Sequence, residues 1–113
     1  MEMGEFRSKW VGDTERQQAR ILLTIRALGP VIVVVDEAYH HFVEEPAYRT
    51  AVGLIGRHPN VVVARTFSKI YGLAGVRLGY GIGHPEFIAE LEKIRQPFNI
   101  NAIAQAGALA ALD

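Results

Sequence analysis

The sequence contains no cysteine, no long hydrophobic run and no excess of charge of either sign. Without cysteine, the chain can form neither a disulfide framework nor a thiolate zinc site. Apolar runs such as Val31–Val35 are far shorter than the ~20 residues that a membrane-spanning helix needs. The 12 basic and 12 acidic side chains balance, which argues against a surface built for nucleic acid or for an anionic membrane. We therefore expect a small-molecule ligand, no nucleic-acid partner and no membrane.

The length of the chain limits what it can build. Its 113 residues correspond to one modest domain, and half of them are hydrophobic. A domain of this size buries only roughly two-thirds of the surface that its unfolded chain exposes. Residues 1–6 lack the basic and then apolar pattern of a signal peptide. We expect a cytoplasmic protein that is too small to be a two-domain enzyme.

Two apolar segments predict neighbouring strands of a parallel sheet. Val31–Val35 and Val61–Ala64 are continuously apolar and rich in β-branched residues, which is typical of strands covered on both faces. The segment between them predicts a helix that begins at Pro46 and ends before His58. A strand, helix and strand form a right-handed unit that brings the ends of both strands to the same edge of the sheet.

Further elements are predicted on both sides of this unit. Asp13 can cap a helix whose apolar residues recur at helical spacing up to Leu28. Leu78–Gly83 predicts a third, shorter strand, Pro85 opens another helix, and Asn101 can cap a final helix rich in alanine. The pattern as a whole indicates an α/β fold.

A glycine-rich segment after the second predicted strand carries the most specific chemistry. Lys69 supplies an amine that can form a Schiff base with an aldehyde. Arg77 has a planar fork suited to two phosphate oxygens, and the hydroxyls of Thr66 and Ser68 can donate to the same group. These residues indicate a carbonyl cofactor that carries a phosphate, namely pyridoxal 5'-phosphate (PLP).

The end of the first predicted strand supplies the remaining groups that PLP requires. A carboxylate against the pyridine nitrogen keeps that nitrogen protonated and makes the ring an electron sink, and Asp36 is placed for this role. Tyr39 can reach the phenolic oxygen of the cofactor. Each residue also has an ordinary interpretation, such as a turn cap for Asp36 or a surface charge for Lys69. Only the combination is specific.

Residues 31–113 resemble the central part of fold-type-I PLP-dependent aminotransferases, most closely the histidinol-phosphate aminotransferases. The motifs that carry the resemblance occur in the family's order and spacing: Asp36-Glu-Ala-Tyr39, Arg65-Thr-Phe-Ser-Lys69, Gly72–Tyr80 and Arg95–Asn101. The resemblance implies a three-layer α/β/α fragment of the PLP-dependent transferase large domain, with a mostly parallel sheet. Residues 30–113 would belong to that domain, residues 1–29 would form a divergent segment with one amphipathic helix, and the small C-terminal domain would be absent.

The resemblance also implies an activity. This is the exchange of an amino group between histidinol phosphate with 2-oxoglutarate and imidazole-acetol phosphate with glutamate, in histidine biosynthesis. The substrates would be small amino acids and oxo acids, and the full-length protein would be a homodimer. The implied roles are Lys69 as Schiff-base lysine and proton carrier, Asp36 on the pyridine nitrogen, Tyr39 on the phenolic oxygen, and Ser68 and Arg77, with Thr66 as a weaker candidate, on the phosphate.

Alternatives remain open within and outside this class. Threonine-phosphate decarboxylases and aromatic aminotransferases carry similar motifs, and the family's substrate-binding arginine has no counterpart here. A non-catalytic remnant is a further alternative, since missing positioning groups would leave transamination by this piece alone slow or absent. The apolar strand followed by Asp36-Glu37 also matches magnesium-binding ATPases, but the phosphate loop that they require does not occur in the sequence.

Two nearby features receive no role in the cofactor site. The adjacent His40 and His41 would point to opposite sides of an extended chain, so we expect no metal there. Glu37 is expected to face away from the cofactor and to cap a turn or pair with a base. Because a short sheet would leave apolar edges open to water, we also expect the chain alone to be marginally stable or to depend on a partner.

Overall fold

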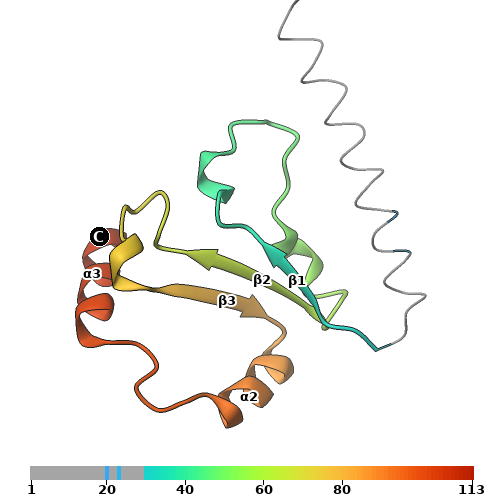
Figure 1. Cartoon of the computed structure of the whole chain (residues 1–113). Coiled ribbons are helices and arrows are strands. Elements are labelled where there is room, and N and C mark those ends of the chain that lie inside the picture. Colours follow the sequence, from blue (N-terminus) through green and yellow to red (C-terminus); the bar gives the residue numbers. More distant parts are fainter. Residues whose placement is uncertain (1–19, 21–22, 24–29) are drawn as a thin grey trace, which may run out of the picture. The chain divides into compact units, whose positions relative to one another are not determined.

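The computed structural model describes residue 20, residue 23 and residues 30–113 (Figure 1). The helix predicted between Asp13 and Leu28 lies outside the described residues, except for helical Arg20 and Leu23. Residues 32–113 form a unit of their own, which carries the elements considered below. No helix in the described part of the chain is long and apolar enough to cross a membrane.

A sheet with the strand order β1-β2-β3 forms the centre of this unit. The strands are β1 (Val33–Asp36), β2 (Val61–Thr66) and β3 (Gly79–Gly83), so the three predicted strands and the α/β class are confirmed. β1 and β2 are parallel, whereas β2 and β3 are antiparallel. The second pairing is antiparallel because the connection between β2 and β3 holds no helix that crosses the sheet, only the 3₁₀ turn η3 (Ala74–Val76).

The connection from β1 to β2 differs from the prediction. Instead of a helix from Pro46, it contains two short 3₁₀ turns, η1 (His40–Phe42) and η2 (Ala51–Leu54). The Thr50 side chain accepts a hydrogen bond from the Val52 amide and so caps the N-terminus of η2. Glycines at positions 53 and 56 further disfavour a long helix, so the predicted helix is wrong in type and length.

The core lies where η2 packs on the sheet. Val61 and Val63 of β2 are fully buried, and Ile55, which follows η2, is buried against them. β1 is covered less completely, because Val33 and Val35 are half-buried whereas Val34 is 65% exposed. The prediction of a strand covered on both faces therefore holds for β2 in the middle of the sheet but not for β1 at its edge.

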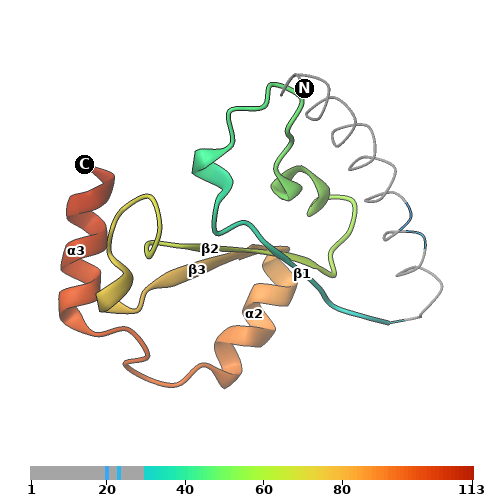
Figure 2. The same cartoon turned by 45° about the horizontal axis from the view of Figure 1, so that its top comes forward.

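Two α-helices follow the sheet, as the sequence predicts (Figure 2). They are α2 (Pro85–Ile94) and α3 (Ala102–Leu112). Pro85 occupies the first turn of α2, and the Asn101 side chain caps α3 by accepting from the Ala104 amide at 2.8 Å. α2 contacts β3, and α3 contacts η3, so both ends of β3 have a helix nearby.

Several large apolar side chains are exposed on these helices and the loop between them. They include Ile94 (78% exposed), Phe98 (98%) and Ile103 (76%). Such surfaces favour association. The expectation of marginal stability or of a partner stays a prediction.

Candidate active site

The first two strands end at the same edge of the sheet. Asp36 is opposite Ala64 in the parallel register, and the amide of Glu37 donates to the Ala64 carbonyl at 2.9 Å. The chain after β1 is thus held against β2 for one more residue. The loop that follows β2 carries Lys69, so the predicted juxtaposition of the two motifs is present.

Tyr39 and Lys69, which come from the two different motifs, are in direct contact. Nζ of Lys69 lies 5.0 Å from the centroid of the Tyr39 ring, which is a cation–π arrangement. Both residues are exposed. The backbone of the lysine loop is fixed by a tight turn, in which the Gly72 amide donates to the Lys69 carbonyl at 2.9 Å and Gly72 has a φ of 67°.

Asp36 and Thr66 each end a strand with a similar turn. Oδ1 of Asp36 accepts from the Ala38 amide at 2.9 Å, and Oγ1 of Thr66 accepts from the Ser68 amide at 3.0 Å. Such contacts between a side chain and the amide two residues later stabilise turns and orient the side chain. The turn-capping interpretation of Asp36 is therefore correct, and this contact leaves the exposed carboxylate able to bind a second group.

Arg77 lies in the same connection between β2 and β3 as Ser68 and Lys69. It follows η3 in the left-handed conformation, with a φ of 59°, and its guanidinium donates to the Ala74 carbonyl at 2.8 Å. A non-glycine residue in this region costs about 1 kcal/mol or more relative to ordinary conformations. The exposed guanidinium keeps further donors for a phosphate.

An aromatic cluster supports the lysine loop. Phe67 is 6% exposed, and its ring centroid lies 5.0 Å from that of Tyr71 and 5.8 Å from that of Tyr80. Because Phe67 immediately precedes Ser68 and Lys69, this packing anchors the start of the loop to the sheet.

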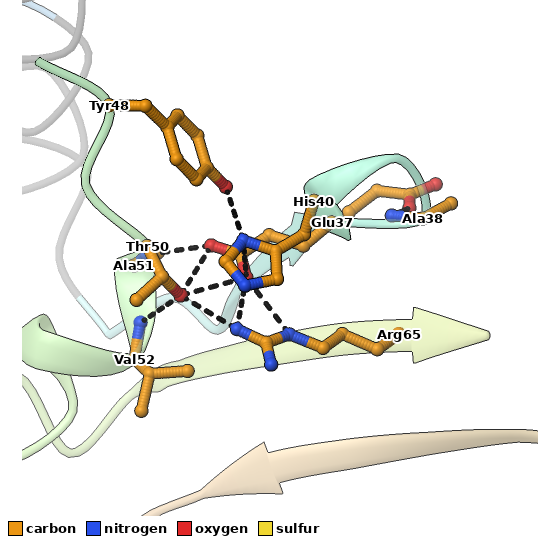
Figure 3. A network of polar contacts seen from close by, with 9 residues as sticks. Glu37, Ala38, His40, Tyr48, Thr50, Ala51, Val52 and Arg65 are labelled. Carbon is orange, nitrogen blue, oxygen red and sulfur yellow. Dashed lines mark hydrogen bonds and ion pairs between the residues drawn. The ribbon is translucent and has the colours of Figure 1, made fainter. Parts of the chain in front are cut away.

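A buried ion pair lies between the two strand ends, and the sequence analysis did not identify it as a unit (Figure 3). Glu37 is 7% exposed, and its Oε2 accepts from Nη2 of Arg65 at 2.9 Å and from Nε at 3.1 Å. Its Oε1 accepts from the Ala51 amide at 2.6 Å, and Thr50 Oγ1 contacts both carboxylate oxygens. Glu37 therefore both pairs with a base and caps η2, as expected.

Electrostatics keep this pair charged. Burial alone would raise the pKa of Glu37, but hydrogen bonds from Ala51, Thr50 and Arg65 outweigh burial and place its pKa below the ordinary value. Burial opposes the charge of Arg65 as well, yet Glu37 keeps the pKa of this guanidinium above its ordinary value. Burial and the negative charge of Glu37 raise the pKa of Tyr48.

A simple signal points to this pair: Arg65 interrupts an otherwise apolar strand, and a charge in a covered strand needs a partner. Its partner becomes evident only from the strand register. Asp36 is opposite Ala64, and Glu37 and Arg65 are the residues that follow them.

The exposed groups at this edge fit PLP. Lys69 offers an amine for the aldehyde, Tyr39 a phenol, Asp36 a carboxylate for a protonated ring nitrogen, and Arg77 a cation for the phosphate. These four side chains are exposed, whereas the side chains of Glu37 and Arg65 are largely buried and bind each other.

Comparisons with known proteins point to the same chemistry. The family profile described as "Aminotransferase class I and II" matches residues 13–113. The chain is 54% identical over 82 residues to histidinol-phosphate aminotransferase 2 of Ralstonia nicotianae, which covers 73% of this chain and 22% of that protein. It is 48% identical over 83 residues to an aromatic amino acid aminotransferase of Mycobacterium tuberculosis, covering 74% of this chain and 24% of the relative.

A solved structure agrees with the fold. The histidinol-phosphate aminotransferase of Sinorhizobium meliloti, in complex with pyridoxal-5'-phosphate, is 44% identical to this chain with a TM-score of 0.64. The match covers 72% of this chain and 22% of that one. The chain thus spans less than a quarter of the length of these relatives.

Proposed function

Because the chain belongs to the class I and II aminotransferases, we propose that residues 30–113 form part of a PLP-binding domain whose catalytic lysine is Lys69. The observation that carries this proposal is the contact between Lys69 Nζ and the ring of Tyr39, 5.0 Å from its centroid, at the edge where Asp36 ends β1. The amine and the phenol thus come together from two separate motifs, and the carboxylate of Asp36 ends the strand that leads to the phenol.

Each residue has a defined task in this proposal. PLP, when bound, supplies an aldehyde that reacts with amines and a ring that withdraws electrons from the substrate's α carbon. Lys69 binds the aldehyde and, once released by substrate, accepts the proton from the α carbon. Asp36 holds a proton on the ring nitrogen, and Tyr39 donates to the phenolic oxygen. Arg77, Ser68 and Thr66 bind the phosphate, with Thr66 the weakest candidate because its hydroxyl already donates to the Leu78 carbonyl at 3.4 Å.

The proposed reaction belongs to a longer protein, because the chain spans only 22% of the histidinol-phosphate aminotransferase it matches. It is the transfer of the amino group of histidinol phosphate to 2-oxoglutarate, giving imidazole-acetol phosphate and glutamate in histidine biosynthesis. The names of the relatives support this substrate. Aromatic amino acid transamination is the second candidate, since a relative of that name is 48% identical. Dimer formation and a cytoplasmic location stay predictions.

A titration of the purified chain with PLP tests the cofactor site. Binding of the aldehyde to an amine changes the absorbance of PLP, and we expect a saturable change in the wild type and in Lys93→Ala but not in Lys69→Ala. Lys93 is a matched control because its side chain is 66% exposed and lies on α2. Equal responses of Lys69→Ala and the wild type would overturn the proposal.

A further inference from the structure

Alternation along the strands separates two sets of residues at the candidate site. Asp36 is opposite Ala64, so the next step of the register sets Glu37 opposite Arg65. Side chains of successive residues in extended chains point to opposite faces. Glu37 and Arg65 therefore share one face, and Asp36 and Thr66 share the other.

On the first face, hydrogen bonds connect three segments of the chain. Glu37 follows β1, Arg65 belongs to β2, and Thr50 precedes η2, yet their side chains form one hydrogen-bonded cluster (Figure 3). Nη2 of Arg65 donates to Glu37 Oε2 and to Thr50 Oγ1, both at 2.9 Å. The exposed fractions of the Glu37 and Arg65 side chains are only 5% and 14%, so water competes weakly for these bonds.

The second face carries the turns that orient the candidate cofactor residues. Glu37 is the central residue of the turn in which Asp36 accepts from the Ala38 amide. Arg65 directly precedes Thr66, which accepts from the Ser68 amide. A displacement of either charged residue therefore moves the adjacent turn, because each shares a peptide bond with it.

We infer that Glu37 and Arg65 are positioning residues, which act through Asp36 and through the Thr66–Ser68 turn to hold the two halves of the PLP site in register. This inference rests on the proposed function. It assigns neither residue a contact with the cofactor, because both charges are already bound to each other on the opposite face.

The test compares variants of the full 113-residue chain. Glu37→Gln removes the charge, Thr50→Val removes only a hydroxyl, and Thr50→Ser retains it as the matched control. In the chain without PLP, amide hydrogen exchange is measured at Ala38 and Ser68 relative to Ile88, whose amide donates to the carbonyl of His84, the residue before α2. We expect faster relative exchange at Ala38 and Ser68 in Glu37→Gln and in Thr50→Val, and wild-type exchange in Thr50→Ser.

The second readout is the affinity for PLP from the absorbance titration. We expect Glu37→Gln to weaken it by roughly tenfold, the scale of one lost hydrogen bond to a charged group. Ile55→Val, a core variant that loses one methylene group against Val61 and Val63, controls for lower stability. Thermal melting confirms that each variant is folded; Thr50→Val carries the test if Glu37→Gln does not fold.

The outcomes separate this inference from the proposed function. Wild-type affinity and wild-type exchange in both Glu37→Gln and Thr50→Val would overturn the inference and leave the proposed function intact. An equal effect of Ile55→Val on both readouts would also overturn it, because general destabilisation would then be the cause. If the wild type showed no titration at Lys69, the proposed function would fail, and the exchange ratios would still decide whether the pair holds the two turns.

Discussion

Nζ of Lys69 lies 5.0 Å from the centroid of the Tyr39 ring, and this contact joins the loop after β2 to the turn after β1. The aromatic face attracts the ammonium group. The contact favours a position of the amine over the Tyr39 ring, at the edge of the sheet where β1 and β2 end.

Replacement of Tyr39 separates the role of its ring from that of its hydroxyl. In the chain without PLP, the ring current of Tyr39 should shift the NMR signals of the Lys69 side chain, whose Nζ lies 5.0 Å from the ring centroid. We expect Tyr39→Phe to retain this shift and Tyr39→Leu to abolish it, with the Lys93 signals as an internal reference. An exposed cation–π contact is worth about 0.5–1 kcal/mol, so stability changes little in either variant. Identical Lys69 signals in all three proteins would rule out the contact.

The Glu37–Arg65 pair makes stability depend on pH in a defined direction. The pKa of Glu37 is lower in the folded chain than its ordinary value of 4.5, so the folded state favours the ionised form. This contribution is fully present above pH 4.5 and is lost as the pH falls through the lower pKa of the folded state. Urea unfolding should therefore show a free-energy difference between wild type and Glu37→Gln of about 1–3 kcal/mol at pH 7.

That difference should shrink as the pH falls below 4.5, because the wild-type carboxylate then becomes neutral as well. Gln is the matched substitution, since it keeps the shape of Glu37 and one accepting oxygen but, like the protonated carboxyl group, carries no charge. A difference of the same size at neutral and at strongly acidic pH would show that the charge is not what stabilises the fold.

Gly79 is required by the close approach of β2 and β3. A Cβ atom at this position would lie 2.8 Å from the Arg65 carbonyl oxygen, whereas one at Gly81 would meet only a methyl group of Val62 at 3.7 Å. We expect Gly79→Ala to lower the free energy of unfolding by about 1–3 kcal/mol because the strands must shift. Gly81→Ala serves as the control on the same strand, and thermal melts of both variants make the comparison. Equal melting temperatures would contradict the crowding argument.

Replacement of Arg77 by glycine should have opposite effects on the stability of the fold and on the affinity for PLP. Glycine tolerates the left-handed conformation that Arg77 adopts at a φ of 59°, so Arg77→Gly should gain up to about 1 kcal/mol of stability. The same variant loses the proposed phosphate ligand, and we expect its affinity for PLP to fall about tenfold or more. Arg77→Lys keeps a charge without the fork and should bind with intermediate affinity. A Gly variant that is more stable and binds PLP as wild type would exclude Arg77 from the site.

Local signals in the sequence account for most of the fold. The β-branched run before Asp36 and the run that begins at Val61 correctly predict strands, because a short apolar run of β-branched residues is a strand signal contained within the segment itself. Asn101 correctly predicts the start of α3, since capping involves only the next few residues. The helix expected after Pro46 does not form, because the Ala51 amide donates to the distant carboxylate of Glu37 and a short turn is fixed there instead.

The candidate site, like the fold, is only partly predictable from the sequence. The sequence motifs identify Asp36, Tyr39 and Lys69 as candidates, and the parallel register brings their segments together. The Glu37–Arg65 pair depends on that register and on burial, which no local pattern specifies. The left-handed conformation of Arg77 is likewise a property of the folded turn rather than of its residue type.

The most direct test of the central claim is to trap bound PLP with borohydride and to locate the label by peptide mass mapping. The chain contains the lysines Lys9, Lys69 and Lys93, so every outcome can be assigned to one side chain. The account predicts a saturable label confined to Lys69 and absent from Lys69→Ala. Labelling that does not saturate, or equal labelling of Lys69 and Lys93, would contradict it and leave a chain that shares the family's fold without its cofactor site.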